Sequence, residues 1–323
     1  MVYRIGLLGA SKIAPGAVIA PAKANPDFEI VAVGARDADR AKTYAETYGI
    51  AHVAGSYAEL VRRDDVDVVY NALPPGGHLE WTIAALQAGK AVLCEKPFAM
   101  NAGEAQRMVA AAASTGRVLI EAFHYRFHSL IREAEALVRA GRLGAIRRGS
   151  AVFNVNIART PDELRWRAEL GGGGLMDLGC YPIHALRTLL GEEPVVRSAS
   201  GAFEGRVDTQ ITAELDFPGG GSASMGCAMI TDTISATLTL EGELGRLEIT
   251  PFIAPQRRGR MTTTVKGETT VHDASGPTSY EAQLIHLGEV LSGRAKPLTG
   301  GADAVANMTV IDAIYAAAGR PAA

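Results

Sequence analysis

Short apolar runs alternate with alanine-rich stretches of helical spacing over the first 120 residues. The apolar, β-branched runs predict strands at residues 3–8, 30–33, 66–70, 91–94 and 118–120. Between them, the spacing predicts helices at residues 38–48, 79–88 and 103–114. Strands that alternate with helices need crossover connections, so we expect a doubly wound parallel α/β sheet over residues 1–122.

The pattern changes after residue 123. A helix at residues 130–139, ending at Gly141, is followed by longer alternating segments that predict strands at 149–157, 209–217, 223–230, 235–241 and 245–250. Helical spacing returns at 280–291 and 302–318. We therefore expect an α+β domain over residues 123–323 with a large, predominantly antiparallel sheet. Its outer face would carry Ser and Thr with some apolar residues such as Met225 and Met229, and would be solvated or buried in an oligomer.

The composition is that of a globular protein long enough for two domains. Of 323 residues, 47% are hydrophobic and 21% charged, and the formal charge of −3 gives no reason to expect nucleic acid or anionic lipid as partner. No segment approaches the roughly 18 uninterrupted apolar residues of a membrane span. Cys94, Cys180 and Cys227 are an odd count without paired spacing, so we expect a protein of the reducing cytoplasm.

A turn of small residues directly follows the first predicted strand and opens a helix. Gly9 takes the first glycine position of the dinucleotide fingerprint, while Ser11 and Ala14 replace the second and third glycines. Such a turn lets backbone N–H groups approach a pyrophosphate at the positive end of a helix. We expect a dinucleotide in contact with Gly9, Ser11, Lys12 and Ile13. The alternative is an ordinary strand–turn–helix junction.

The end of the second strand indicates which nicotinamide cofactor is bound. An NAD site places a carboxylate there for the ribose hydroxyls, whereas this strand ends in Gly34 and Ala35. Arg36 suits adenine stacking and a 2′-phosphate, and Arg40 follows one helical turn later. NADP is therefore favoured over NAD. The alternative is two solvated arginines paired with neighbouring aspartates.

Four motifs in order along the chain resemble one known family. They are the Gly9 turn, the segment 73–78, the Glu-Lys-Pro stretch in 92–99 and the glycine-rich segment 172–181. Together with the C-terminal helix at 303–313, they resemble the glucose–fructose oxidoreductase and inositol dehydrogenase (Gfo/Idh/MocA) family over nearly the whole chain. The Gly9 turn and residues 123–128 look closest to the dihydrodiol dehydrogenase branch, whose members use NADP.

The resemblance implies roles for residues that follow two strands of the first domain. Lys96 would lie beside the nicotinamide ribose and the reacting carbon, and its bond to Pro97 would be cis. The residues implied to contact the cofactor are Leu73, Pro74, His78, Glu95 and Lys96 itself. The pattern agrees for Lys96, because open α/β sheets bind ligands at the carboxyl ends of their strands. The alternative is a surface lysine after a strand.

The run of four glycines at 171–174 opens a second candidate segment, since glycine permits close approach to a ligand. Asp177 and Tyr181 are four residues apart and project from one face of a helix. The resemblance makes Tyr181, where many members carry histidine, the general acid–base group, with Asp177 fixing the substrate hydroxyl or the lysine. A nearby Lys96 ammonium would favour the phenolate. His184 replaces an acidic or amide residue and is either a substrate contact or a structural histidine.

Weaker signals surround these motifs. Arg126 and Arg167 are candidates to reach a polar substrate, with surface salt bridges as the alternative. His124 and His128 are spaced as helical metal ligands can be, but no third ligand accompanies them, so no metal is expected.

These features predict an NADP-dependent dehydrogenase or reductase that moves a hydride to or from a hydroxyl or carbonyl carbon of a sugar or similar polyol. Two alternatives stay open: a ketoreductase or dehydrogenase of nucleotide-sugar or natural-product biosynthesis, and a cofactor-binding regulator without turnover. The presence of Lys96, Asp177 and Tyr181 argues against the regulator. We also expect a homodimer or homotetramer formed through the C-terminal sheet.

Overall fold

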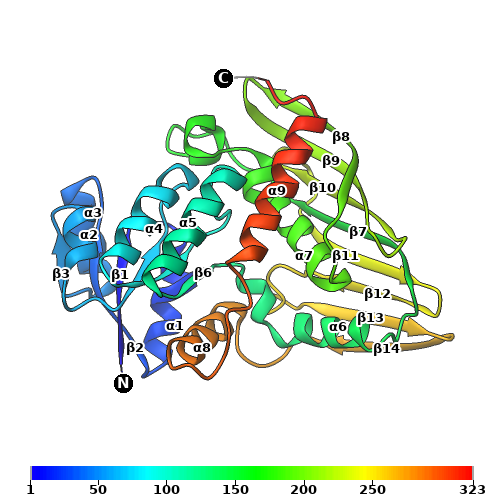
Figure 1. Cartoon of the computed structure of the whole chain (residues 1–323), viewed down its shortest axis with the longest axis horizontal. Helices are drawn as coiled ribbons and strands as arrows, with labels where there is room; N and C mark the ends of the chain where they lie inside the picture. Colours follow the sequence, from blue (N-terminus) through cyan, green and yellow to red (C-terminus); the bar gives the residue numbers. More distant parts are fainter. Residues whose placement is uncertain (1, 322–323) are drawn as a thin grey trace. The chain divides into compact units, whose positions relative to one another are not determined.

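The computed structural model describes residues 2–321, and the chain forms two compact units (Figure 1). The first unit extends to Phe123 and also takes in Tyr280–Val305. The second comprises His124–Ser279 and the segment from Ala306. The predicted division after residue 122 placed everything that follows in one domain, whereas the chain returns to the first unit after residue 279.

A six-stranded parallel sheet forms the centre of the first unit, in the order β3-β2-β1-β4-β5-β6. The strands are β1 (Tyr3–Leu8), β2 (Phe28–Gly34), β3 (His52–Ala54), β4 (Val68–Asn71), β5 (Ala91–Cys94) and β6 (Leu119–Glu121). Every residue of β4 and β5 is buried, as expected of strands covered on both faces. The predicted doubly wound fold is confirmed.

Helices connect these strands. They are a π-helical turn η1 (Pro15–Ile19) leading into α1 (Ala20–Ala24), then α2 (Ala38–Tyr48), α3 (Tyr57–Arg62), the short η2 (Pro75–Gly77) leading into α4 (His78–Gln87), and α5 (Ala102–Thr115). Side chains cap the starts of α2 and α5: Asp37 accepts from the Arg40 N–H and Asn101 from the Glu104 N–H. The late helix α8 (Ser279–Leu291) lies beside α1, and its Leu284 and Leu287 share a core with α1 and β1 (Figure 1).

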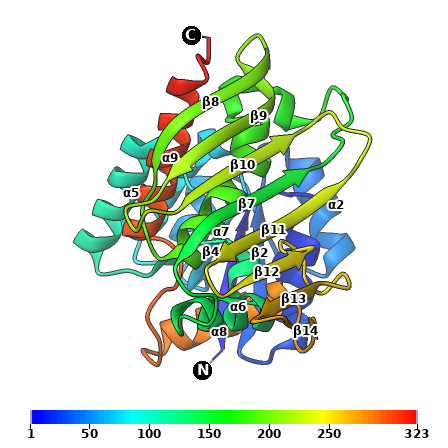
Figure 2. The same cartoon turned by 90° about the vertical axis from the view of Figure 1, so that its right-hand side faces the viewer.

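An eight-stranded sheet dominates the second unit, in the order β14-β13-β12-β11-β7-β10-β9-β8 (Figure 2). The strands are β7 (Ile146–Asn154), β8 (Val195–Glu204), β9 (Val207–Asp216), β10 (Ser222–Ala228), β11 (Ser235–Gly242), β12 (Gly245–Thr250), β13 (Arg260–Val265) and β14 (Glu268–Asp273). β7 and β10 pair in parallel and the other neighbours are antiparallel. This confirms the predicted, mainly antiparallel sheet.

One face of this sheet packs against helices. Gly149 of β7 lies against Leu186 of α7 (Cys180–Leu190), and α6 (Ser129–Arg139) packs beside α7. The prediction that Met225 and Met229 lie on the outer face is wrong: they are 2% and 0% exposed, because Met225 shares the register and the inner face of Ala151. The last helix is α9 (Ala302–Ala317). Within residues 2–321, no helix is long and apolar enough to cross a bilayer.

Candidate active site

The turn after β1 has the geometry of a nucleotide-binding turn. Gly9 has a φ of +94°, and a Cβ there would lie 3.3 Å from Leu73 Cδ2 and 3.5 Å from the Ala72 carbonyl oxygen. The positive φ favours glycine, and the space beside the Cα atom is tight. Leu73 follows β4, which neighbours β1 at the point where the strand order reverses, the place where open α/β sheets bind dinucleotides.

The rest of the turn also fits a dinucleotide. The Ser11 hydroxyl accepts a hydrogen bond from the Ala14 N–H at 3.3 Å, and the Ser11 carbonyl accepts one from the Tyr44 hydroxyl at 3.0 Å. Lys12 is exposed, and the apolar Ile13 is 41% exposed. Lys12 and Ile13 are therefore open to a ligand, whereas Gly9 is buried and Ser11 is half-buried.

The two arginines after β2 differ in their surroundings. Arg36 is exposed, whereas Arg40 donates from Nη2 to the Ala10 carbonyl oxygen at 2.8 Å and so ties α2 to the turn. Asp37 is used as the cap of α2. Among the described residues, neither arginine forms an ion pair with Asp37 or Asp39, so the alternative of two solvated ion pairs is not what the structure shows.

His78 joins the two predicted cofactor loops. Its Nε2 lies 2.7 Å from the Leu73 carbonyl oxygen, and its Nδ1 lies 3.0 Å from that of Pro97 and 3.2 Å from that of Phe98. The ring is fully buried, and burial lowers its pKa. Because both nitrogens face backbone carbonyls, the geometry favours a role in holding the loops together over the predicted direct cofactor contact.

Glu95 and Lys96 follow β5 at the same edge of the sheet. The Tyr70 hydroxyl donates to Glu95 Oε1 at 2.5 Å, and the Lys96 N–H donates to Glu95 Oε2 at 3.3 Å. The Lys96–Pro97 bond is cis, as predicted, and Lys96 is half-buried. Sequence reasoning missed Tyr70, whose place in a buried strand gave no sign that its hydroxyl orients Glu95.

In the second unit, the glycine run wraps around neighbouring backbone. The Gly172 N–H donates to the Arg167 carbonyl at 2.9 Å, and the Gly173 N–H donates to the Arg165 carbonyl at 3.0 Å. A Cβ on Gly172 would lie 2.5 Å from that Arg165 oxygen. These contacts hold two short helices, η4 (Leu164–Trp166) and η5 (Ala168–Leu170), against the start of the next segment.

Asp177 lies in the π-helical turn η6 (Leu175–Gly179), directly before α7. Its Oδ2 accepts from Arg165 Nε at 2.6 Å, and Arg165 also pairs with Glu163. Sequence reasoning missed Arg165 as the partner of Asp177, although it lies only two residues from the predicted Arg167. Arg167 itself bonds Glu169 at the surface, and whether it touches substrate stays a prediction.

Tyr181 lies at the start of α7 in a cluster of aromatic rings. It is 4% exposed, and its ring centroid lies 5.9 Å from that of His124, 5.8 Å from that of Tyr125 and 5.8 Å from that of Phe153. The edge-to-face angles are the favoured arrangement for such rings. His184 is 1% exposed and its Nδ1 lies 2.6 Å from the Tyr125 hydroxyl, so the geometry favours the structural reading of His184.

The remaining candidates are occupied by structural contacts. Both terminal nitrogens of Arg126 donate to Glu135, at 2.6 and 2.7 Å, and both side chains are buried, which favours an internal ion pair over the predicted substrate contact. His124 Nδ1 lies 2.8 Å from the Ser279 hydroxyl, and His128 Nδ1 caps α6 by accepting from the Leu130 N–H. In the described part of the chain, no three potential metal ligands cluster.

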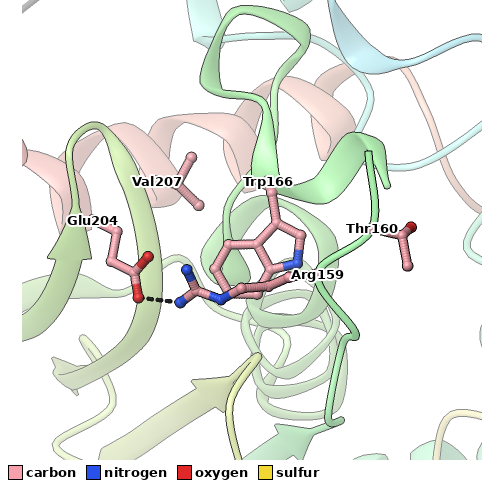
Figure 3. Close-up of a pocket in the computed structure, with 5 residues that line it drawn as sticks. All are labelled: Arg159, Thr160, Trp166, Glu204 and Val207. Carbon is pink, nitrogen blue, oxygen red and sulfur yellow. Dashed lines mark hydrogen bonds and ion pairs between the residues drawn. The ribbon is translucent and has the colours of Figure 1, made fainter. Parts of the chain in front are cut away.

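A cavity of about 290 Å³ lies in the second unit (Figure 3). Its lining residues are Arg159, Thr160, Trp166, Glu204 and Val207. The Arg159 guanidinium lies 4.2 Å from the centre of the Trp166 ring and pairs with Glu204. Arg159 covers the indole face on which a sugar would stack, and Glu204 neutralises the charge of Arg159 that would attract an anion. We therefore assign neither ligand to this cavity.

Comparisons with known proteins match both units. The Gfo/Idh/MocA model described as "Oxidoreductase family, NAD-binding Rossmann fold" matches residues 3–123, and the C-terminal domain model of the same family matches residues 131–268. D-xylose 1-dehydrogenase (NADP(+)) 2 of Haloferax volcanii is 32% identical over 98% of both chains.

Two solved structures are also similar. One is an aldose-aldose oxidoreductase from Caulobacter crescentus, 31% identical, with a TM-score of 0.90 over 98% of both chains. The other is a 3-ketoreductase from Actinomadura kijaniata, solved with NADP and TDP-benzene, 27% identical, with a TM-score of 0.90 over 98% of both chains. The chain therefore belongs to the Gfo/Idh/MocA family of oxidoreductases, as its four motifs predicted.

Proposed function

We propose that this oxidoreductase transfers a hydride between NADP and a hydroxyl or carbonyl carbon of a sugar or similar polyol. The observation that carries the proposal is the η6–α7 segment, which presents a carboxylate and a phenol one helical turn apart in a chain that also holds a dinucleotide turn. The xylose dehydrogenase and the aldose-aldose oxidoreductase support a sugar substrate, and the name of the former supports NADP.

The nicotinamide of bound NADP supplies or accepts the hydride. The turn at Gly9 would bind the pyrophosphate through backbone N–H groups, and Arg36 would bind the 2′-phosphate. His78 would keep the loop after β4 in contact with the loop that carries Lys96, because its two ring nitrogens lie against carbonyls of both loops, one of them donating its N–H. Glu95, oriented by Tyr70, would support the same loop.

We assign proton transfer to Tyr181. In oxidation the substrate hydroxyl loses its proton to the Tyr181 oxygen while its carbon loses the hydride, and in reduction both transfers run in reverse. Lys96 would act on the same reacting carbon, by donating a hydrogen bond to the substrate oxygen and favouring the phenolate. Asp177, oriented by Arg165, would accept a hydrogen bond from a neighbouring substrate hydroxyl.

A ketoreductase acting on a nucleotide-linked sugar is the second candidate. The similarity to the 3-ketoreductase from Actinomadura kijaniata favours it, and the same lysine and tyrosine would serve the reductive direction. A panel of free aldoses, polyols and nucleotide-linked keto sugars with NADP(H) separates the two. Binding of NADPH without turnover across that panel would instead indicate a regulator.

Replacing the Tyr181 hydroxyl tests the mechanism. We expect Tyr181→Phe to lower kcat by about 100-fold or more, since general acid–base catalysis contributes about 10²–10⁴-fold, while the Kd for NADPH changes less than about twofold. Tyr3→Phe is the matched control, because the Tyr3 hydroxyl, at the start of β1, forms no hydrogen bond within residues 2–321. Full activity of Tyr181→Phe would remove the assignment.

We further infer assembly into a dimer or tetramer through the outer face of the eight-stranded sheet, in the reducing cytoplasm. The outer face carries half-buried Ser150, Thr237 and Thr239, and all three cysteines are buried without a disulfide. Light scattering coupled to size-exclusion chromatography measures the oligomeric state directly, and a monomer at micromolar concentration would contradict the assembly.

A further inference from the structure

A buried carboxylate bonds the start of the segment that carries Asp177 and Tyr181. Asp208, near the start of β9, is 0% exposed. Its Oδ2 accepts from the Leu175 N–H at 2.6 Å, and its Oδ1 accepts from the Tyr315 hydroxyl at 2.7 Å. Leu175 is the first residue of η6, where N–H groups lack partners within the helix, so Asp208 supplies an acceptor that the helix itself does not.

The glycine run is shaped around this carboxylate. Gly173 has a φ of +133°, and a Cβ there would lie 2.2 Å from Asp208 Oδ1. A Cβ on Gly174 would lie 3.3 Å from Asp208 Oδ2. This glycine run was interpreted from the sequence as allowing close approach of a ligand. The run also leaves the space through which the Asp208 carboxylate reaches the start of η6.

The last helix holds the same segment at a second point. Asn307 of α9 is 1% exposed, and its Nδ2 donates to the Cys180 carbonyl at 3.3 Å, where η6 meets α7. Its Oδ1 accepts from Arg187 Nη1 at 3.2 Å. Because Tyr315 also belongs to α9, this helix contacts the segment directly through Asn307 and indirectly through Asp208.

We propose that Asp208 is a positioning residue for Tyr181 and Asp177, with Tyr315 fixing its orientation. The inference rests on the proposed function, because it assigns those two side chains to the reaction. Because both carboxylate oxygens of Asp208 accept hydrogen bonds, they fix the position of the first residue of η6. The orientations of Asp177 and Tyr181, which follow in the same segment, depend on that position. A displacement of about 1 Å at reacting groups can cost about 100-fold in rate.

Three variants separate positioning from simple stabilisation. We expect Asp208→Ala to lower kcat by about tenfold or more while the KM for NADPH changes less than about twofold. Asp208→Asn should keep kcat within about threefold of the wild type, because its Oδ1 accepts from Leu175 and its Nδ2 donates to the Tyr315 oxygen. Ile249→Ala, in the core at β12, should lower Tm like Asp208→Ala but leave kcat within about twofold.

Hydrogen–deuterium exchange gives a readout that needs no turnover. Asp208→Ala should speed exchange in residues 175–190 relative to the wild type and Ile249→Ala. Unchanged exchange there, or a kcat for Asp208→Ala equal to that of Ile249→Ala, would overturn the proposal, as would failure of Asp208→Asn to restore activity. If the wild type turns over no substrate, the proposed function fails, and exchange alone still decides whether Asp208 holds the helix start.

Discussion

At the scale of single residues, Arg36 is the side chain on which cofactor choice depends. It is exposed after β2 and, within residues 2–321, forms no ion pair with an aspartate, whereas Arg40 is bonded to the Ala10 carbonyl. We expect Arg36→Ala to raise the KM for NADPH about tenfold or more, since a hydrogen bond to a charged group contributes about 1.5–3 kcal/mol. The KM for NADH should rise much less, because NADH lacks the 2′-phosphate and loses only the stacking of Arg36 on adenine.

Steady-state kinetics with both cofactors makes this measurement. Arg107→Ala is the matched control, since Arg107 is an exposed arginine on α5 whose contact with Glu104 is 4.0 Å long. Equal rises in KM for NADPH and NADH would show that Arg36 acts on the shared part of the cofactor and would remove the basis for NADP preference.

At the scale of elements, α6 begins with a cap that depends on protonation. His128 Nδ1 accepts from the Leu130 N–H at 3.1 Å, which only an unprotonated nitrogen can do, and burial lowers the pKa of His128 below its usual 6.5. Between the folded and unfolded pKa values the unfolded state binds more protons. The free energy of unfolding should therefore fall as pH drops below about 6.5, by up to about 1.4 kcal/mol per pH unit.

His128→Asn should keep the cap and lose that part of the pH dependence, because an amide oxygen accepts the same hydrogen bond without titrating. Urea unfolding of both proteins at several pH values between about 5 and 7 measures the difference. His52→Asn, at a half-exposed histidine, serves as control. The pKa of His78 is also lowered by burial, but His78 is present in both the wild type and His128→Asn. The difference between their curves therefore reports on His128 alone. Parallel curves for wild type and His128→Asn would contradict the prediction.

Elements with strong local periodicity were predicted well. The bounds of β1, α2, β5 and β12 agree with the sequence pattern, because alternating or helical spacing is a property of neighbouring residues. β8, β13 and β14 were missed, since they lie toward one edge or the other of the sheet and bury few side chains. A strand with little alternation of apolar and polar residues cannot be predicted from its own sequence. It forms because it pairs with neighbouring strands of the sheet.

The candidate site shows the same division. The turn at Gly9, the Lys96 loop and the Asp177–Tyr181 pair could be predicted because each is a local motif. Arg165 and Asp208 were missed because their roles depend on partners 12 and 33 residues away in the chain. Arg126 was predicted to contact substrate because of its charge. The charge alone does not reveal that both of its terminal nitrogens donate to Glu135.

At the scale of the whole molecule, all three thiols lie inside the two units. Cys94, Cys180 and Cys227 are each 0–1% exposed, and burial raises the pKa of Cys94 and of Cys227 well above its usual value. Thiolate rather than thiol reacts with disulfide reagents, so both access and ionisation oppose reaction. We expect none of the three to react with Ellman's reagent over minutes at about pH 8 in the native protein, and all three to react in guanidinium.

Ser114→Cys provides the positive control, because Ser114 is exposed on α5 and a thiol there should react at once in the native protein. Thiol release is read by absorbance, with intact folding checked by circular dichroism. The three native thiols span β5, α7 and β10, so their joint protection reports on both units in one assay. Rapid reaction of one cysteine per wild-type chain with Ellman's reagent would contradict the prediction and show that one of these elements opens readily. Cysteine-to-serine variants would identify that element.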